Sequence, residues 1–276
     1  MKTIILFLLA NLYLTECLTI SSKSSWNDLK VTWGFNPFNS NYFSQLPQKE
    51  SDAVRLGWTK DKDCSQNFRG SRYLLKSDKA ILIIFDQSGQ IAGIGTTIPK
   101  GLPYNFPSKN IQPYLVDEGD SFVSYLYFTE PSTICSKSSF SPKTFGDKLI
   151  IVGDQKQISM PMSESEVDSF WTKGKCFVSM GVHYWADVTG PGNYNTKADN
   201  FFPIFGLYNK GVLNGFGWVF TADLDSNRYE HPPYAQTLPL MLFQVPSFFN
   251  DPTQFGGKLS AIHVFFDSNP RLNNFC

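Results

Sequence analysis

The sequence predicts a mainly β protein built from two homologous β-rich halves, with short helices and a sandwich- or barrel-like architecture. Segments from the first half recur in the same order in the second half, which is the signature of an internal repeat. Apolar runs rich in β-branched and aromatic residues alternate with turns that contain Gly and Asn, as strands and hairpins do. The length of 276 residues suits two domains of ordinary size or one large domain.

The recurrence is clearest at two cysteines, where "GWTKDKDC" (57–64) is repeated as "FWTKGKC" (170–176). The other matched pairs are DLKVTWG (28–34) with DKLIIVG (147–153), GSRY (70–73) with GVHY (181–184), IIFDQSGQIAGIG (83–95) with FGLYNKGVLNGFG (205–217), YNFP (104–107) with YEHP (229–232), and the segments 124–135 and 262–276, each ending in Cys. We therefore predict a first repeat at 18–135, a Ser-rich linker at 136–146 and a second repeat at 147–276.

Each repeat is expected to hold one short helix, one β-hairpin and one closing strand. Acidic segments with apolar residues at helical spacing predict the helices, and Gly-containing turns between apolar runs predict the hairpins. In chain order these elements are the helices near 48–58 and 163–171, the hairpins at 79–98 and 201–220, and the closing strands at 122–128 and 258–266.

The first residues are typical of a secretory signal peptide, which we place at residues 1–17. A lysine precedes a short apolar run from Ile4 to Leu12, and small residues occupy the positions before a cleavage site after Cys17. A lipoprotein with Cys17 as the lipidated residue is the alternative, which the preceding Glu16 fits poorly. No later segment approaches the ~20 apolar residues of a membrane span, so we expect a secreted, extracellular protein.

The charge balance excludes some classes of partner. The chain has 24 basic and 24 acidic residues, a formal net charge of zero, and no basic patch. Nucleic acid and anionic membrane surfaces both require concentrated positive charge, so neither is expected as a partner. The sequence also lacks the motifs of a P-loop, an EF-hand, a serine-hydrolase elbow and a zinc protease. The expected partner is an unidentified small molecule or glycan, and the oligomeric state is left open.

Four cysteines follow the signal peptide, and an even number in an exported chain predicts two disulfides. The preferred pairing is Cys64 with Cys135 and Cys176 with Cys276, because a duplicated unit would keep its own bridge. A pairing crossed between the repeats is the alternative. No two of these cysteines are close in sequence, which disfavours zinc ligation by thiolates.

All three histidines, His183, His231 and His263, lie in the second repeat, where the first repeat has Arg, Phe and Tyr. Three imidazoles can bind zinc or copper and leave a position open for substrate. A metal site formed by the three histidines is therefore the leading hypothesis, and the metal could also be catalytic. Asp187 and Glu230 are candidates for an additional ligand or for a carboxylate that orients a ring. A single catalytic histidine without metal, or no such role for any of the three, are the alternatives.

The high aromatic content, 16%, supports a rival function. Tyr184, Trp185, Tyr208 and Trp218 are candidates for a pocket wall, although aromatic residues more often fill the core of a sandwich. The rival function is a secreted binding or structural module without catalysis. It would recognise a glycan, a small apolar ligand or a protein through aromatic pockets.

One local resemblance involves the same segment. "MGVHYW" followed by "PIFGLYNKG" resembles a phrase of uncharacterised secreted bacterial proteins, which have Met-Gly-x-His-Tyr/Trp before a Tyr-x-Gly turn. The resemblance extends from Met180 to about Trp218, and the matching segment of the first repeat lacks the histidine. It implies no activity or substrate, and it adds weight only to His183.

Overall fold

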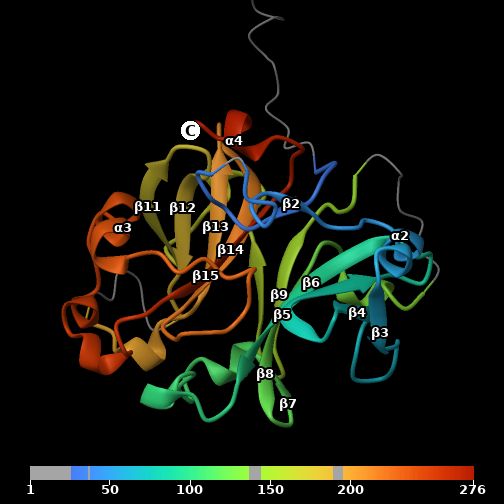
Figure 1. Cartoon of the computed structure of the whole chain (residues 1–276), viewed down its shortest axis with the longest axis horizontal. Coiled ribbons are helices and arrows are strands. Elements are labelled where there is room, and N and C mark those ends of the chain that lie inside the picture. The colour runs from blue at the N-terminus through green and yellow to red at the C-terminus, as the bar shows by residue number, and fades with distance from the viewer. Residues whose placement is uncertain (1–25, 37, 137–143, 189–194) are drawn as a thin grey trace, which may run out of the picture.

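The computed structural model describes residues 26–36, 38–136, 144–188 and 195–276, and its chain forms two antiparallel sheets that pack as a sandwich (Figure 1). One sheet has seven strands and the other has eight. The prediction of a mainly β protein with short helices is confirmed, in the sandwich form. The signal peptide predicted at 1–17 lies outside the described residues, as do residues 137–143 of the predicted linker.

The strands of the two sheets come from segments spread along the whole chain. Across the seven-stranded sheet they are β11 (Trp171–Phe177), β12 (Gly181–Ala186), β13 (Ile204–Asn209), β14 (Val212–Phe220), β15 (Ser260–Phe265), β1 (Lys30–Val31) and β2 (Ser44–Gln45). Across the eight-stranded sheet they are β10 (Gln157–Met160), β9 (Leu149–Val152), β8 (Ser121–Tyr127), β6 (Ile91–Pro99), β5 (Asp78–Phe85), β4 (Ser71–Leu75) and β3 (Trp58–Lys62), with β7 (Val116–Glu118) paired to β8 beside this path.

Each sheet takes two strands from the other half of the chain. β1 and β2 precede all other strands; in the seven-stranded sheet β1 pairs with β15, and β2 pairs with β1. β9 and β10 begin the predicted second repeat; in the eight-stranded sheet β9 pairs with β8, and β10 pairs with β9. The repeats predicted at 18–135 and 147–276 therefore do not fold as two separate sheets, and their common origin stays a prediction.

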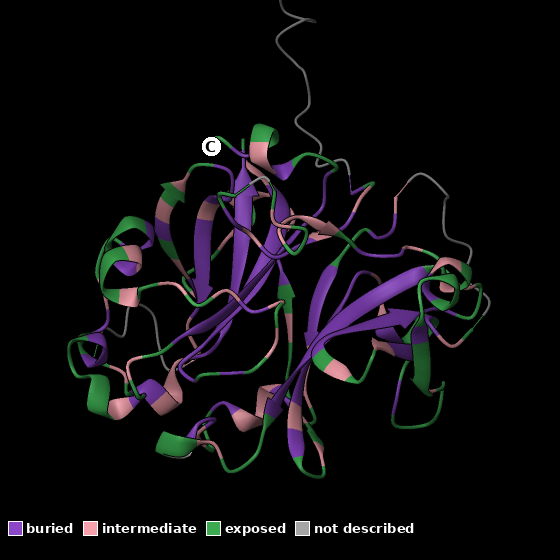
Figure 2. Ribbon diagram, in the orientation of Figure 1, coloured by how far each residue is buried: buried purple, intermediate pink, exposed green. Residues whose placement is uncertain are grey.

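The main core lies between the two sheets, where alternate residues of the strands interdigitate. On β14, Phe216, Trp218 and Phe220 point into this core and are fully buried. The Trp218 indole donates a hydrogen bond to Ser124 Oγ of β8, 2.9 Å away, and so joins the two sheets. Figure 2 shows that the central strands are buried along most of their length, whereas the connecting loops are largely exposed.

A second apolar cluster covers the outer face of the seven-stranded sheet, which is the face turned away from the other sheet. Helix α3 (Tyr234–Met241) lies over this face and contacts β11 through a hydrogen bond from Lys175 Nζ to the Pro239 carbonyl, 2.8 Å long. Leu238 and Met241 of this helix are buried in the cluster. Helix α3 therefore covers part of the outer face, and we call it the roof; a space remains between this helix and the sheet.

The other helices are short. They are α2 (Glu50–Arg55) and α4 (Pro270–Asn273), with the 3-10 turns η1 (Pro103–Asn105), η2 (Gln112–Tyr114), η3 (Pro131–Thr133), η4 (Glu164–Glu166), η5 (Ala198–Asn200), η6 (Ser247–Asn250) and η7 (Pro252–Gln254). The helix expected near 163–171 is only the turn η4, because Ser163 makes no side-chain cap and Val167 is already extended. No helix in the described part of the chain is long and apolar enough to cross a membrane.

Two disulfides join segments that are distant in the sequence. Cys64 is bonded to Cys135, and Cys176 is bonded to Cys276, with Cα atoms 5.7 Å and 6.1 Å apart. The preferred pairing is therefore confirmed, and the crossed pairing is excluded. The second bridge ties the last residue of the chain to β11, at the edge of the seven-stranded sheet.

Candidate functional site

A pocket of about 370 Å³ lies between the outer face of the seven-stranded sheet and helix α3. Its walls are mainly aromatic and aliphatic side chains, among them Trp33, Phe177, Met180, Trp185, Phe205 and Leu238. Phe35 and Leu240 also line the pocket and are 73% and 56% exposed, so they mark where the pocket reaches solvent. Glu230 and His263 are polar lining residues whose side chains are largely buried, and we call the part of the lining that they form with the buried Ala261 the inner end.

His263 and Glu230 form a hydrogen-bonded pair at this inner end. The Nδ1 atom of His263 lies 2.9 Å from each carboxylate oxygen of Glu230, and one of these oxygens also accepts the Trp33 backbone N–H at 2.7 Å. Because a carboxylate accepts hydrogen bonds, Nδ1 carries the proton and the pair holds the ring in one orientation. The opposite nitrogen, Nε2, is buried and has no hydrogen-bond partner among the described residues.

His183 lies beside His263 and is completely buried. The two ring centroids are 6.0 Å apart and the rings are nearly perpendicular, at 87°. Neither ring nitrogen of His183 makes a hydrogen bond within the described part of the chain. Burial, together with the charge that His263 could carry, lowers the pKa of His183 to about 3, so its imidazole is neutral at physiological pH. Backbone groups of Lys175 and Gly181 lie near the ring and oppose this shift, but neither has the geometry of a hydrogen bond to it.

Two glycines in β14 allow these rings to approach although their strands are not neighbours. β13 and β14 lie between β12, which carries His183, and β15, which carries His263. Gly217 pairs with His263 and with Phe205, and a Cβ atom at Gly217 would lie 2.3 Å from the Phe205 ring. The missing side chain lets the Phe205 ring lie across β14, with its centroid 5.2 Å from that of His183 and 5.1 Å from that of His263. Gly215 leaves a similar gap one pair further along.

The third histidine does not join the pair. His231 lies at the rim of the pocket, its side chain is 45% exposed, and its Nδ1 faces the Leu259 carbonyl at 3.1 Å and Asp223 at 3.7 Å. Across residues 26–276, apart from the stretches not described, no three His, Cys, Asp or Glu side chains form a group that could hold a metal ion. The structure thus brings together two of the three predicted ligands. Glu230 orients the ring of His263, and not that of His231, which follows Glu230 in the sequence.

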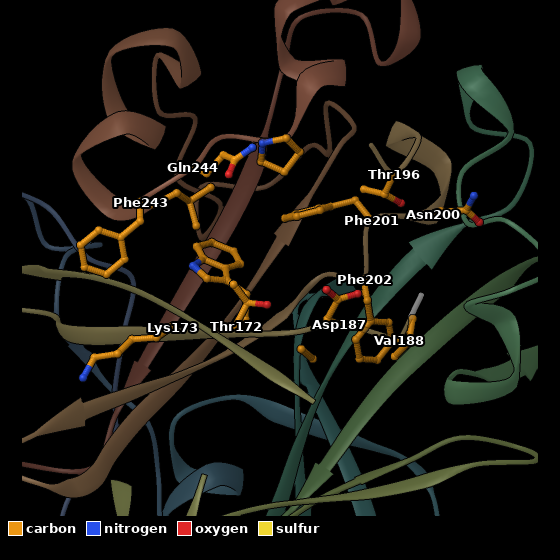
Figure 3. A pocket seen from close by; sticks show the side chains of 14 residues that line it. Thr172, Lys173, Asp187, Val188, Thr196, Asn200, Phe201, Phe202, Phe243 and Gln244 are labelled. Atoms are coloured by element: carbon orange, nitrogen blue, oxygen red, sulfur yellow. The ribbon is translucent and has the colours of Figure 1, made fainter. Parts of the chain in front are cut away.

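Asp187 lines a different and smaller cavity, of about 60 Å³, whose lining side chains are drawn in Figure 3. In that view Asp187 lies beside Val188 and Phe202, whereas Lys173 and Phe243 stand at the opposite side. Trp185 lines both cavities, and its indole nitrogen is buried without a hydrogen-bond partner among the described residues. Asp187 is therefore placed with the small cavity and not among the residues of the histidine pocket.

Of the four aromatic residues predicted for a pocket wall, only Trp185 lines either of these two cavities. Tyr184, Tyr208 and Trp218 point to the opposite face of the sheet and are buried in the core between the sheets. The correction follows from the alternation of side chains along a strand, since Tyr184 is flanked by His183 and Trp185, which both lie on the outer face of the sheet.

Sequence reasoning missed two parts of the pocket, the wall at Trp33 and the roof formed by α3. Trp33 follows β1, which joins this sheet from the other end of the chain, and its indole donates a hydrogen bond to Ser179 Oγ at 2.9 Å. The match of 28–34 with 147–153 marked the segment but could not show which sheet it enters. The helix α3 contains Pro239, which hid it from a prediction based on helical propensity.

Comparison with protein-family models, with curated proteins and with solved structures finds no match to this chain. The site is therefore interpreted from its own geometry. A concave, mostly apolar pocket with a few convergent polar groups is the usual form of a small-molecule site, and such pockets measure roughly 300–1,000 Å³. The pocket below α3 has this form, and its volume of about 370 Å³ lies near the lower end of that range.

Proposed function

We propose that this protein is a secreted binding protein for a small apolar ligand, which it holds between helix α3 and the outer face of the seven-stranded sheet. The observation that carries the proposal is the pocket of about 370 Å³ with apolar walls and a polar inner end. Burial of apolar ligand surface against such walls supplies about 25 cal/mol for each Å² removed from water. A glycan would need more polar groups along the walls than this pocket offers.

The inner end of the pocket would orient the ligand. Glu230 and His263 are polar groups of the lining there, and His183 lies next to His263. Nε2 of His263 and both ring nitrogens of His183 lack hydrogen-bond partners within the described residues. A buried polar atom without a hydrogen bond costs about 1–3 kcal/mol. A ligand that presents its polar end to the imidazoles would recover part of this cost, which favours an amphipathic molecule with one polar end.

Secretion is the second part of the proposal. The two disulfides support it, because such bonds persist in oxidising compartments such as the extracellular space. The sequence of residues 1–17 supports it independently. Expression of the full chain in a secretory host, followed by N-terminal sequencing of the protein in the medium, tests it. Retention of the first 17 residues, or of the whole protein inside the cell, would count against it.

Binding is tested with N-phenyl-1-naphthylamine, a neutral apolar dye that becomes fluorescent in apolar surroundings. We expect saturable binding at one site of the disulfide-bonded protein. Ala261→Phe places a large ring at the inner end of the pocket, and should weaken dye binding at least about tenfold, which corresponds to 1.4 kcal/mol. Ala235→Phe is the matched control, because Ala235 is an exposed residue of the same α3 roof and does not line the pocket.

A second variant protects the test against misfolding of Ala261→Phe. Leu240→Lys puts a charge at the mouth of the pocket, on a side chain that is already 56% exposed, so the fold should tolerate it. We expect weaker dye binding here as well, whereas Leu272→Lys, at another exposed leucine, should leave it unchanged. No saturable binding by the unmodified protein, or equal affinities for all variants, would overturn the proposal.

A further inference from the structure

We propose that His183 and His263 together bind one copper ion at the inner end of the pocket, with Glu230 holding His263 in the orientation for binding. This inference goes beyond the apolar ligand and does not depend on it. It also differs from the three-histidine hypothesis, since His231 takes no part. Four observations support it: the unpartnered nitrogens, the separation of the rings, the carboxylate behind one ring, and the contrast with the other sheet.

The unpartnered atoms are concentrated at this place. In the described residues, five buried side-chain nitrogen or oxygen atoms lack a hydrogen-bond partner, and three of the five belong to His183 and His263. Buried polar groups in proteins are nearly always hydrogen-bonded, so each exception requires a reason. Coordination of one metal ion would satisfy two of these three atoms, Nε2 of His263 and one nitrogen of His183, which a purely structural role of the two rings leaves unsatisfied.

The separation of the rings suits a shared ion. An imidazole nitrogen binds zinc or a similar metal at about 2.0–2.1 Å, so two rings on one ion have centroids no more than roughly 6.5 Å apart. The centroids of His183 and His263 are 6.0 Å apart.

Glu230 stands where metal sites usually place a supporting carboxylate. A histidine that binds a metal through one nitrogen generally donates the other N–H to a carboxylate or carbonyl, which fixes the ring and makes it a stronger ligand. His263 makes this contact with both oxygens of Glu230 at 2.9 Å, and the Trp33 backbone N–H fixes the carboxylate in turn. The nitrogen left over on His263 is the buried, unpartnered Nε2.

At the corresponding positions of the eight-stranded sheet, the side chains are hydrogen-bonded to each other. Arg72 pairs with Ile84 on the neighbouring strand, as His183 pairs with Leu207, and Tyr125 faces Gly95 as His263 faces Gly217. There the two side chains satisfy each other, because the guanidinium of Arg72 donates to the phenol oxygen of Tyr125.

Both of these side chains also bind Glu118, which accepts from Arg72 at 2.8 Å and from Tyr125 at 2.6 Å. The eight-stranded sheet thus closes its cluster with ion pairs and hydrogen bonds within the chain. In the imidazole pair only Nδ1 of His263 has such a partner, Glu230. The other three ring nitrogens have no hydrogen-bond partner in the described residues, and therefore have the capacity to bind something else.

Copper fits the donor set better than zinc does. Zinc sites in proteins use three or four protein ligands, whereas only two imidazoles converge here among the residues that the structure describes. Among divalent first-row metals, copper binds nitrogen donors most strongly. His263 lines the pocket, so a ligand or solvent in the pocket could take a further coordination position on that side.

The test measures metal, not activity. The full, disulfide-bonded chain is incubated with copper sulfate, passed through a desalting column in buffer with glycine as a competitor, and analysed for copper by atomic emission. We expect about one equivalent in the unmodified protein, about one in His231→Phe, and less than about a tenth in His183→Phe and in His263→Phe. Glu230→Gln should lower copper affinity by ~10–100-fold without abolishing binding, as loss of a supporting carboxylate does.

Electron paramagnetic resonance of the copper-loaded, unmodified protein gives a readout that survives misfolding of a variant. We expect hyperfine splitting from two imidazole nitrogens. No retained copper in the unmodified protein, a spectrum with oxygen ligands only, or loss of copper in His231→Phe alone would overturn the proposal. Since no apolar dye is used, this result and the result of the binding test can fail separately.

Discussion

Gly217 offers a sharp test of how the pocket and the sheet share space. Its backbone has no left-handed strain, so an alanine there differs from glycine only by the Cβ atom. That atom would lie 2.3 Å from the ring of Phe205 and 2.4 Å from the carbonyl oxygen of Ile262. Both contacts are far shorter than a van der Waals distance, and one of them is with backbone, which cannot rotate away.

We expect Gly217→Ala to lower the free energy of unfolding by about 3 kcal/mol, near the upper end of the usual cost of overpacking. For a protein of this size the midpoint of thermal unfolding should then fall by roughly 6–12 °C. The assay is urea and thermal unfolding of the disulfide-bonded protein, followed by tryptophan fluorescence. Near-ultraviolet circular dichroism of the folded state should also change, because the Phe205 ring contacts Trp185 at a tilt of 46°, with the ring centroids 4.8 Å apart.

Gly211→Ala provides the matched control. Gly211 has a φ of +81°, and a Cβ atom added there would have no neighbouring atom within 4 Å, so only backbone strain opposes the alanine. That strain costs about 1–2 kcal/mol. If Gly217→Ala costs less than Gly211→Ala, the close packing of Phe205 over β14 is not what the geometry indicates, and the explanation for the meeting of the two histidines fails.

Three further predictions concern the core, the acidic limb of stability and the second disulfide. Trp218→Phe breaks the buried hydrogen bond to Ser124 Oγ, 2.9 Å long, and should cost about 1–3 kcal/mol in urea unfolding; an unchanged midpoint would show that the sheets do not need this bond. Burial raises the pKa of Glu118, but hydrogen bonds from a lysine, a phenol and an arginine outweigh it, so the net pKa lies below its ordinary value of 4.5. The stability from Glu118 is thus present above that value and lost as pH falls through the lowered pKa; Glu118→Gln should flatten the decline of urea midpoints between about pH 5 and pH 3, and parallel declines would refute this. Replacing Cys176 and Cys276 by serine opens a loop with a sequence separation of 100, and should cost about 4–5 kcal/mol of unfolding free energy; a cost below about 1 kcal/mol would contradict the loop-closure argument.

Local signals in the sequence predicted the class of the fold and the disulfides. The hairpin expected at 79–98 is β5 and β6, and the hairpin expected at 201–220 is β13 and β14, because Gly-containing turns and apolar runs are read from neighbouring residues alone. The matched phrases around Cys64 and Cys176 placed one bridge in each half, as the structure has it.

The site depended on long-range information that one sequence does not contain. That His183 and His263 meet is decided by two glycines on the strand beside His263 and by the ring that crosses them, not by spacing along the chain. That His231 stays apart is decided by its place at the rim, next to Asp223. The face on which Tyr184 lies could have been predicted, because successive side chains of a strand point to opposite faces. If His183 faces a site, Tyr184 points away from that site.

The exchange of strands between the halves has a consequence for synthesis on the ribosome. Lys30 of β1 pairs with Phe265 of β15, so the first strand to emerge has to wait for the last one before its ladder can close. At ~5–20 residues per second, this delay is on the order of tens of seconds. During that time β1, although paired with β2, has an unpaired edge on the side that β15 later takes. The segment that completes the ladder also brings Cys276, the partner of Cys176. Residues 260–276 therefore complete both the sheet and the second disulfide, and a chain released before they are made would leave β1 without its partner strand β15.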